Sequence, residues 1–541
     1  MNKCHIFIVI KILFLVQQCQ CEVYTAMVDL EDLLDTEHVL INTIENYIKA
    51  EEQKMDLLKR YMEIYKKQQN IARRDTQLYL SNPINAYTLV KRLTADWTQV
   101  EALIGTNINQ EALLNISYYK ENMKFPTDED LNGAAVALTR LQDTYQLDTS
   151  SLARGELNGV KYSSELTAAD CFELGRQSYN VGDFYHTRLW MQEAEARLKR
   201  EANETVDHSE VLEYLAFSIY KQGDVALALD LTNKLLDIIP DHGRALGNRV
   251  YYEDQLKTSE DTKTDRKKGD DESQTVETAG VKFYKVNYRR DLYEALCRGD
   301  ETLPVEVQAK LKCRYITRGN PFLLMAPFKV EEAHLDPDIF IFHDVISDNE
   351  IQTIKAMATP RFQRATVQNS QTGALEVAGY RISKSAWLKE EEHKHIADVS
   401  RRTGDITGLN MKSSEELQVV NYGIGGHYEP HFDFARKEET NAFKNLGTGN
   451  RIATVLYYMS DVPQGGATVF PEIRATVWPK KGTAAFWYNL FPSGDGDART
   501  RHAACPVLAG SKWVSNKWLH EEGQEFIRPC TKERPPEELT A

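Results

Sequence analysis

The chain has 541 residues, too many for a single hydrophobic core, so we expect roughly two to four domains. Its formal net charge of −15 excludes the strongly basic surface typical of nucleic-acid-binding proteins. Solubility alone explains the excess of acidic residues.

Residues 1–21 predict a secretory signal peptide. Lys3 precedes two short apolar runs that Lys11 separates, and neither run is long enough to cross a membrane. No later segment qualifies as a membrane span. A secreted chain passes through an oxidising compartment, where the sequons at Asn115 and Asn203 can be glycosylated. The C-terminus is not a retention signal, so a resident of the endoplasmic reticulum would need a partner to hold it there.

The first domain predicted for the mature chain is helical and spans 22–150. Between Met27 and about Ile71, apolar residues recur every three or four positions, with charged residues between them. This spacing predicts a long amphipathic helix. Its apolar stripe can pack within the chain's own bundle or against a second copy of the chain, and the pattern alone favours neither.

A second helical block is predicted over 159–256. The stretch Cys171–Tyr179 precedes a Gly-Asp pair at 182–183, and Leu215–Tyr220 precedes another at 223–224. This order of aromatic, Gly-Asp and small residues is typical of tetratricopeptide helix pairs, which stack into a concave surface suited to an extended peptide. Without further information, each tyrosine of the block is better explained as a core residue than as a binding residue.

The remainder of the chain is predicted to carry a β-rich domain. Residues 257–280 contain almost no apolar side chain and predict a flexible linker. A connecting segment over 281–335 then leads to 336–541, whose short strands, turns and aromatic residues predict a double-stranded β-helix, or jelly-roll. Gly423–Gly426 lacks the lysine of a phosphate-binding loop and predicts a turn between strands. The whole chain is therefore expected to be a multidomain α + β protein.

A candidate metal site lies in this last domain. His431 and Asp433 are two apart on a predicted strand, so their side chains share one face. His502 begins another strand, and Lys512 begins what we expect to be its antiparallel neighbour. Two imidazoles and one carboxylate form the facial triad of non-heme Fe(II) oxygenases. A His-x-Asp motif alone has little specificity, but the distant histidine and the lysine strengthen the prediction considerably.

The open half of such a metal site suits a 2-oxo acid and O2. The acid can chelate iron through its keto and adjacent carboxylate oxygens, which leaves its far carboxylate in need of a buried cation. Lys512 is the candidate for that cation. The residues therefore predict an Fe(II)- and 2-oxoglutarate-dependent dioxygenase that attacks an unactivated C–H bond, with His431, Asp433 and His502 as metal ligands.

From about Cys297 to Cys530 the sequence closely resembles the catalytic region of collagen prolyl 4-hydroxylase alpha subunits, and the resemblance extends along nearly the whole mature chain. The matching stretches are Tyr428–Arg436, Gly465–Pro471, Trp478–Gly482, Arg501–Pro506 and Lys512–His520. The resemblance implies a procollagen-proline 4-dioxygenase that converts proline in Xaa-Pro-Gly sequences to 4-hydroxyproline and releases succinate and CO2. It also implies L-ascorbate as the reductant that rescues oxidised iron.

The resemblance further implies an assembly. The family forms an α2β2 tetramer with protein disulfide isomerase in the lumen of the endoplasmic reticulum, and its alpha subunits dimerise through the N-terminal domain. Two disulfides are implied, Cys297 with Cys313 and Cys505 with Cys530. Cys171 is then left free, as a core residue.

Roles for further residues follow from the same resemblance. In the helical block it implies a tyrosine-lined groove for proline-rich peptide, formed by Tyr179, Tyr185, Phe217 and Tyr220, with Phe217 where the family often has a tyrosine. In the catalytic domain it implies that Tyr422 and Thr468 contact 2-oxoglutarate, and we expect His520 to assist cosubstrate binding or decarboxylation. The residues implied to shape the peptide site are Arg381, Ser383, Glu415, Tyr428, Arg451 and Trp518.

Two alternatives stay open. The first is a related hydroxylase that acts on another target, such as lysine in collagen or a different proline-rich protein. The second is a catalytically silent subunit that only binds proline-rich chains. The peptide-binding block argues against the lysine hydroxylase, and the complete set of metal and lysine residues argues against the silent subunit.

Overall fold

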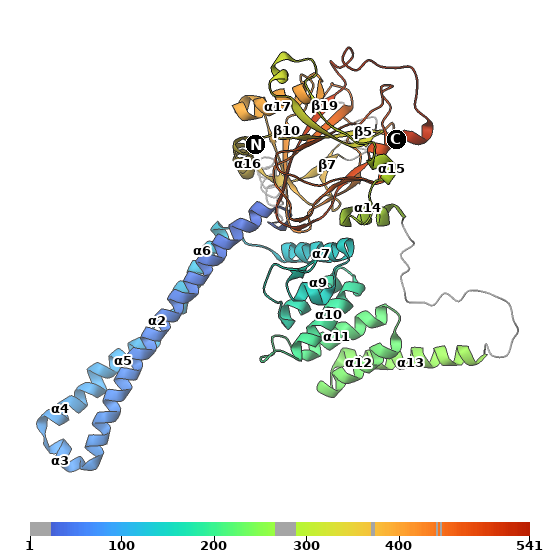
Figure 1. The fold of residues 1–541 in the computed structure, drawn as a ribbon. Coiled ribbons are helices and arrows are strands. Elements are labelled where there is room, and N and C mark those ends of the chain that lie inside the picture. The colour runs from blue at the N-terminus through green and yellow to red at the C-terminus, as the bar shows by residue number, and fades with distance from the viewer. Residues whose placement is uncertain (1–22, 266–287, 369–373, 440–441, 444–445) are drawn as a thin grey trace, which may run out of the picture. The chain divides into compact units, whose positions relative to one another are not determined.

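The computed structural model describes residues 23–265, 288–368, 374–439, 442–443 and 446–541, so the expected signal peptide lies outside the described residues. The chain forms two compact units (Figure 1): one is Asp29–Thr127, and the other combines the residues up to Val28 with Asp128–Ala541.

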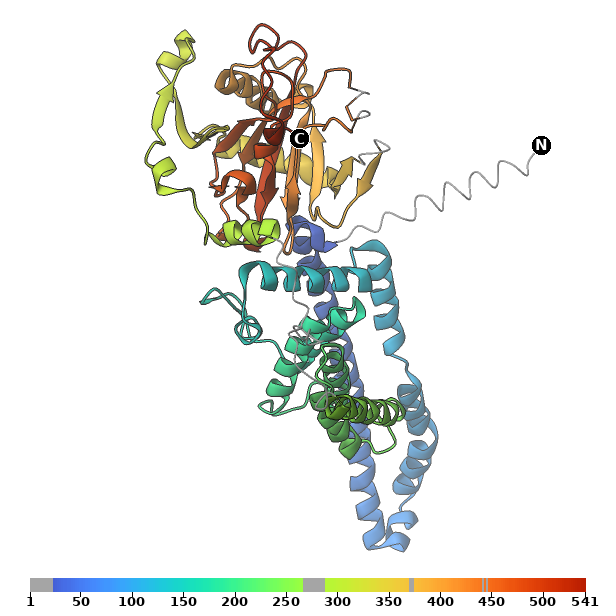
Figure 2. The same ribbon diagram turned by 90° about the vertical axis from the view of Figure 1, so that its right-hand side faces the viewer.

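The smaller unit is entirely helical among its described residues. Its longest element is α2 (Met27–Arg74), a helix of 48 residues that confirms the predicted amphipathic helix. The remaining helices return along α2 (Figures 1 and 2), and they are α3 (Thr76–Ser81), α4 (Pro83–Lys91), the π-helix η2 (Arg92–Asp96), α5 (Trp97–Gly105) and α6 (Asn109–Asn122). Much of the apolar stripe of α2 stays exposed, including Ile41, Ile44, Ile48 and Met55. The bundle of a single chain therefore does not bury the stripe.

The larger unit begins with helical pairs. It contains α7 (Asp128–Tyr145), α8 (Thr149–Ala153), a hairpin of β1 (Glu156–Leu157) and β2 (Val160–Lys161), α9 (Ala168–Asn180), α10 (Phe184–Leu198), α11 (His208–Lys221), α12 (Val225–Ile238) and α13 (Gly243–Asp265). The two predicted Gly-Asp pairs form the turns within the helix pairs. Gly182 and Gly223 adopt positive φ angles, and Asp183 and Asp224 cap the helices that follow.

The first part of the predicted linker is helical. Helix α13 continues to Asp265, because no glycine or proline interrupts 257–265, so this part of the linker prediction is wrong. The rest of the predicted linker lies outside the described residues.

The C-terminal domain confirms the sheet-rich prediction and consists of two packed sheets. The large sheet has nine strands in the order β3 (Cys313–Ile316), β4 (Phe328–Leu335), β5 (Asp338–His343), β16 (Ala484–Tyr488), β12 (Arg451–Tyr458), β19 (Lys512–His520), β10 (Leu417–Tyr422), β9 (Lys384–Leu388) and β6 (Gln363–Arg364). The small sheet has four, in the order β11 (Tyr428–His431), β17 (His502–Ala504), β14 (Thr468–Phe470) and β15 (Ala475–Val477). Two further strand pairs are β13 (Gln464–Gly465) with β18 (Val507–Ala509) and β7 (Thr366–Gln368) with β8 (Leu375–Val377).

Alternate residues along the central strands face different partners. On β12, Leu456 and Tyr458 face the small sheet, where they pack with Phe470. Val455 and Tyr457, which alternate with these residues, face the opposite side of the sheet. There they pack on the helices α16 (Asp348–Ala358) and α17 (Lys394–Thr407). The inner faces of the two sheets thus enclose a core that is separate from the helical layer.

Two sequence-based expectations about this domain are wrong. The later part of the predicted connecting segment, 313–335, contributes β3 and β4 to the large sheet, where they pair with each other and β4 pairs with β5. The strands of His502 and Lys512 are also not neighbours. β17 belongs to the small sheet and β19 to the large one, because β18 and the turn at Gly510 carry the chain from one sheet to the other between them.

The structure also contradicts the implied disulfide pairing. Cys297 is bonded to Cys505 at a Cα–Cα distance of 5.5 Å, and Cys313 and Cys530 are free and exposed. Cys297 lies in the last turn of α14 (Tyr288–Arg298), which packs on the outer face of the small sheet next to Cys505. Sequence proximity was therefore a poor guide to pairing. Cys171 is free and buried, as expected.

The glycine turn between β10 and β11 holds the N-terminal segment. Gly423 N donates to Thr25 O, and Ile424 N donates to Tyr24 O, each at 3.1 Å. A Cβ atom on Gly423 would lie 2.0 Å from Tyr24 O. The turn was therefore predicted correctly, but its glycine is required by the close approach of a distant segment.

Gly423→Ala is expected to destabilise the larger unit by about 1–3 kcal/mol, because the backbone at Tyr24 must move to admit the methyl group. Thermal unfolding measures the effect. Gly379→Ala is the matched control, since a Cβ atom there meets nothing within 4 Å, and its effect should stay within about 0.5 kcal/mol. Equal melting temperatures for the two variants would contradict the prediction.

Candidate metal centre

Three predicted ligands come together at one end of the small sheet. His431 ends β11, Asp433 follows two residues later, and His502 begins β17, where it pairs with His431. One ligand atom from each residue lies within 4.8 Å of the others. Asp433 Oδ1 is 3.7 Å from His431 Nε2, and Asp433 Oδ2 is 3.5 Å from His502 Nε2. It is the only such group among the described residues, and its spacing suits a shared metal ion.

Backbone carbonyls orient both imidazoles. His431 Nδ1 lies 2.8 Å from Glu429 O, and His502 Nδ1 lies 3.0 Å from Thr500 O. Because a carbonyl oxygen can only accept, each Nδ1 must carry the proton, and each Nε2 is left with its lone pair for a metal. The two histidines are therefore fixed in the tautomer that a metal ligand needs.

Aromatic rings hold the imidazoles from the side. The Tyr428 ring stacks on His431 at 3.5 Å between centroids. The rings of Trp487 and Phe470 lie 4.7 and 5.6 Å from His502. These contacts restrict rotation of the ligands and exclude water from one side of the site.

The protonation states suit metal binding. Burial lowers the pKa of His431 to about 3, and the neighbouring His502 acts in the same direction. Burial would raise the pKa of Asp433, but the two imidazoles and Arg451 outweigh it and hold that pKa at about 2. At neutral pH the site thus offers a neutral His431 and an ionised carboxylate.

Lys512, the residue expected to bind the far carboxylate of 2-oxoglutarate, is buried at the start of β19. Its side chain is 1 % exposed, and within the described part of the chain its Nζ has no hydrogen-bond partner. Burial alone lowers the pKa of Lys512 to about 7. A buried amine without a partner is costly, so its presence here fits an anionic ligand that the protein itself does not supply.

Of the two residues expected to contact 2-oxoglutarate, Tyr422 lies near this amine and Thr468 is buried next to Tyr458. Lys512 Nζ is 5.1 Å from the centroid of the Tyr422 ring, and the two residues pair across β10 and β19. Thr468 is buried on β14, where its hydroxyl accepts from Tyr458 at 2.8 Å. Both side chains lie between the sheets, as a cosubstrate contact requires.

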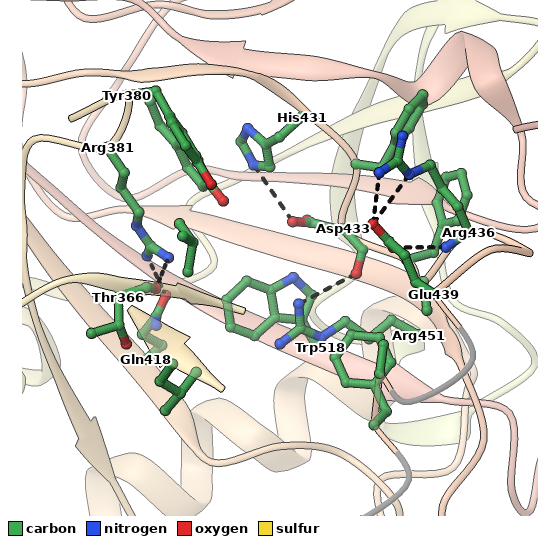
Figure 3. A pocket seen from close by; sticks show the side chains of 18 of the residues that line it. Thr366, Tyr380, Arg381, Gln418, His431, Asp433, Arg436, Glu439, Arg451 and Trp518 are labelled. Atoms are coloured by element: carbon green, nitrogen blue, oxygen red, sulfur yellow. Dashed lines mark hydrogen bonds and ion pairs between the residues drawn. The ribbon is translucent and has the colours of Figure 1, made fainter. Parts of the chain in front are cut away.

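A cavity of about 490 Å³ opens onto His431 and Asp433. Figure 3 shows Tyr380 and Arg381 on one side of these ligands, and Arg436 and Glu439 on the other. Four of the residues implied for the peptide site line it, namely Arg381, Tyr428, Arg451 and Trp518. Further lining residues that sequence did not indicate are Tyr380, Trp387, Gln418, Arg436, Glu439 and Phe443. Two sequence signals were present among them, the proximity of Tyr380 to Arg381 and the place of Arg436 in the matching stretch Tyr428–Arg436.

The remaining two peptide-site candidates lie behind the cavity wall. Ser383 is fully buried, and its carbonyl accepts from Ala365 N. Glu415 binds Arg451 through two contacts, of which Nη2 to Oε2 measures 2.9 Å. The Arg451 guanidinium stacks on Trp518 at 3.9 Å. Glu415 therefore orients a cavity residue and does not line the cavity itself.

His520 belongs to the same network as Glu415. Its Nε2 is 2.9 Å from Glu415 Oε1, and its Nδ1 is 2.8 Å from Gly449 O. Burial would raise the pKa of Glu415, but Arg451 and His520 outweigh it and hold that pKa at about 2. His520 ends β19, and Lys512 begins it. The structure thus places His520 with the residues that hold Arg451, and its expected role toward the cosubstrate remains a prediction.

The helical block carries a continuous row of aromatic rings. Three of the four predicted peptide contacts belong to it: Tyr179 lies 5.7 Å from Phe217, and Phe217 lies 6.0 Å from Tyr220. Five further members of the row were not predicted from the sequence: Phe172, Phe184, Tyr214, Tyr251 and Tyr252.

Tyr185 lies outside this row and packs on His186 at 5.0 Å. The position in the row belongs to Phe184, because consecutive helical residues point in directions about 100° apart.

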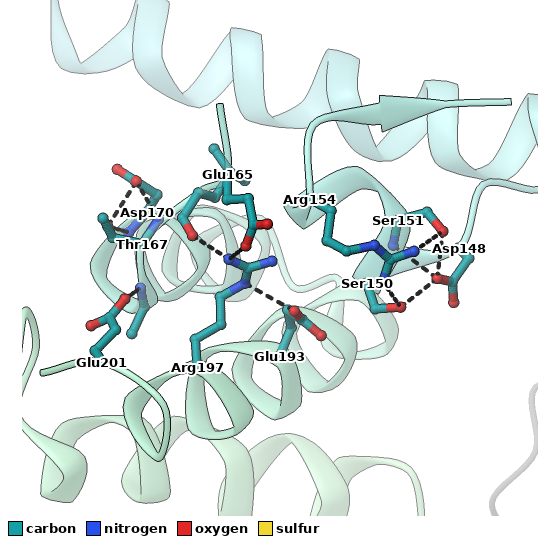
Figure 4. Close-up of polar contacts among 12 residues, drawn as sticks. Asp148, Ser150, Ser151, Arg154, Glu165, Thr167, Asp170, Glu193, Arg197 and Glu201 are labelled. Carbon is teal, nitrogen blue, oxygen red and sulfur yellow. Dashed lines mark hydrogen bonds and ion pairs between the residues drawn. The ribbon is translucent and has the colours of Figure 1, made fainter. Parts of the chain in front are cut away.

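The start of this block is fixed by polar contacts on α9 and α10 (Figure 4). Thr167 and Asp170 form a capping box at the start of α9. Arg197 donates to Leu166 O at 2.5 Å, and Glu201 accepts from Ala168 N at 2.6 Å. These bonds tie the first helix of the pair to the end of the second. The helix pair that carries Tyr179 and Phe184 is therefore held together at this end.

Among the described residues, no helix combines the length and the hydropathy needed to span a bilayer.

Comparisons with known proteins cover nearly the whole chain. Residues 26–159 match the N-terminal region of the prolyl 4-hydroxylase alpha subunit, 168–258 its peptide-substrate-binding domain, and 417–520 the 2OG-Fe(II) oxygenase superfamily. Prolyl 4-hydroxylase subunit alpha-1 of Homo sapiens is 50% identical over 512 residues, which is 94% of this chain and 95% of the relative. Subunit alpha-2 of Caenorhabditis elegans is 50% identical over 523 residues, 96% of this chain and 95% of the relative. A solved viral collagen prolyl hydroxylase from Paramecium Bursaria Chlorella virus-1 aligns with 33% of this chain and 94% of its own, at 23% identity and a TM-score of 0.26.

Proposed function

The chain belongs to the prolyl 4-hydroxylase alpha-subunit family, and we propose that it converts proline in Xaa-Pro-Gly sequences of collagen-like chains to 4-hydroxyproline. It is a 2-oxoglutarate- and Fe(II)-dependent dioxygenase. The observation that carries the proposal is the grouping of His431, Asp433 and His502, together with the buried Lys512, whose amine has no hydrogen-bond partner among the described residues.

Each residue has a distinct task in this reaction. The three ligands would hold Fe(II) and leave half of its coordination sphere to the reactants. Lys512 would bind the far carboxylate of 2-oxoglutarate, and the rings of Trp487 and Phe470 keep water from His502. When bound, Fe(II) with 2-oxoglutarate and O2 supplies the oxidant for the C–H bond, and succinate and CO2 are the co-products. L-ascorbate would restore iron that becomes oxidised without substrate turnover.

The substrate class is supported by two surfaces. The cavity next to the metal ligands presents Arg381 and Arg451 held over the rings of Tyr428 and Trp518, at 4.7 and 3.9 Å. These guanidinium groups can donate to peptide carbonyls. The aromatic row of the helical block suits the preformed polyproline II helix of a proline-rich chain, which loses little entropy on binding.

The assembly and location are part of the proposal. The exposed apolar stripe of α2 supports a contact with a second copy of the chain. The names of the relatives describe alpha subunits, which supports a beta partner, and we propose protein disulfide isomerase in an α2β2 tetramer. Such a partner would also retain the protein in the lumen of the endoplasmic reticulum. Glycosylation at Asn115 and Asn203 agrees with this location, because both side chains are exposed.

The decisive test measures two products from one incubation. The full chain, co-expressed with protein disulfide isomerase, is given Fe(II), 2-oxoglutarate, ascorbate and a (Pro-Pro-Gly)n peptide, and succinate and 4-hydroxyproline are expected in equal amounts. A collagen-like peptide that contains lysine but no proline is the control, and it should yield no hydroxylated residue. Succinate without hydroxyproline would show that the substrate is another protein. Peptide binding without either product would identify a subunit that only binds proline-rich chains.

A further inference from the structure

A buried polar chain supports the metal-ligand carboxylate from the opposite sheet. Thr454, on β12 of the large sheet, donates from Oγ1 to Asp433 Oδ2 at 2.8 Å. Asn489 Nδ2 donates to Thr454 Oγ1 at 3.0 Å. Thr454 and Asn489 are both fully buried. This chain of bonds reaches one of the three ligands from a sheet that carries none of them.

The donor and acceptor roles in this series of hydrogen bonds follow from the charge of Asp433. An ionised Asp433 can only accept, so the single Thr454 proton must point at it. The hydroxyl oxygen is then free to accept from the Asn489 amide. The backbone of Asn489 is itself fixed, because its N–H donates to Ile452 O at 2.8 Å and its backbone carbonyl accepts from Asp497 N at 2.9 Å. The orientation of the carboxylate is therefore determined by rigid strands.

A neighbour of Thr454 on the large sheet contacts a second metal ligand. Thr454 pairs with Trp487 across β12 and β16, and the ring of Trp487 lies 4.7 Å from His502. The paired residues Thr454 and Trp487 thus contact Asp433 and His502, respectively. Packing alone would be served as well by valine at 454, which has the shape of threonine without its hydroxyl. Threonine is therefore favoured over valine at this position only if its hydrogen bond to Asp433 contributes to the site.

We propose that Thr454 and Asn489 are positioning residues for the metal: they hold the Asp433 carboxylate turned toward the two imidazoles before Fe(II) arrives. The inference rests on the proposed Fe(II) site. A carboxylate that is free to rotate must lose this freedom on binding, whereas one that is already fixed does not. The expected consequence is tighter metal binding by the full chain, with no direct contact between Thr454 and substrate.

The test is the dissociation constant of Fe(II), measured without oxygen by competition with a coloured chelator on the full-chain complex. Thr454→Val is expected to weaken binding about 10–100-fold, the range typical of lost contacts to metal ligands. Thr454→Ser keeps the hydroxyl and should stay within about threefold of the wild type. Asn489→Ala should weaken binding less than Thr454→Val does, because the Thr454 hydroxyl remains.

A matched control separates positioning from packing. Thr403→Val removes an equally buried hydroxyl, one that contacts Tyr457 on the helical side of the large sheet, and Fe(II) binding should not change. Melting temperatures of the metal-free variants establish that each is folded. Wild-type affinity in folded Thr454→Val would overturn the inference, as would equal losses in Thr454→Val and Thr454→Ser. Failure of the wild type to bind Fe(II) would instead overturn the proposed function.

Discussion

Asp433→Ala is expected to abolish Fe(II) binding and to reduce proline hydroxylation to less than about one thousandth of the wild-type rate, or ~4 kcal/mol in the activation barrier. Asp433 supplies the sole carboxylate of the metal group. Without it, only two imidazoles remain to hold a divalent cation in a buried site, and no carboxylate of the group offsets the desolvation of that cation. The loss should therefore appear in binding before it appears in catalysis.

Thermal unfolding with and without Fe(II) separates these two effects. A ligand at about 100 times its dissociation constant stabilises the folded state by about 2.7 kcal/mol, and this gain should vanish in Asp433→Ala. Asp344→Asn is the matched control, because this carboxylate is exposed in the same domain and pairs only with Lys329 among the described residues. Metal-dependent stabilisation that survives in Asp433→Ala would show that the ion binds elsewhere.

The site could be predicted from sequence where its residues are close along the chain or chemically distinctive. His431 and Asp433 share a face because they are two apart, and His502 was identified by its residue type and spacing from Lys512. The supporting contacts gave no such signal. Thr454 lies 21 residues from Asp433, and Asn489 lies 35 residues from Thr454. These residues meet because two sheets face each other, which no local pattern specifies.

The wrong predictions of the disulfide pairing and of the neighbouring strands also concern contacts between distant residues. Cys297 is bonded to a residue 208 positions away, although Cys313 is far closer in sequence. His502 and Lys512 lie on facing sheets because a short strand and a glycine turn intervene. In the helical block, a shift of one residue exchanged Phe184 for Tyr185, since helical direction changes with every residue. Element types were thus predicted well, and the pairing of distant elements was not.

Lys512→Met is expected to weaken 2-oxoglutarate binding by about 2–5 kcal/mol, the usual cost of removing one partner of a buried charge pair. The metal-free protein should at the same time become more stable, because methionine fills the same space without a buried amine. Lys517→Met is the matched control. That lysine is equally buried, but it donates to Glu390 and to Glu415 O, so its loss should destabilise the fold and leave 2-oxoglutarate affinity unchanged.

The pH dependence of cosubstrate binding provides an independent check on Lys512. Burial lowers the pKa of this amine from 10.5 to about 7, and only the protonated form attracts a carboxylate. Affinity should therefore be highest below pH 7 and fall by up to about tenfold per pH unit above it, because binding must then take up a proton. Titrations of 2-oxoglutarate at several pH values measure this slope, which Lys512→Met should lack.

The same pKa shift predicts a change in stability of the cosubstrate-free protein. Between pH 7 and 10.5 the unfolded chain holds a proton on Lys512 that the folded chain has released, so the free energy of unfolding should rise with pH in this window. Below pH 7 both states are protonated, and the full cost of burying the charge remains. Stability curves of the wild type and Lys512→Met should therefore converge as the pH rises from 7. Parallel curves would mean that the Lys512 amine is solvated or paired in solution.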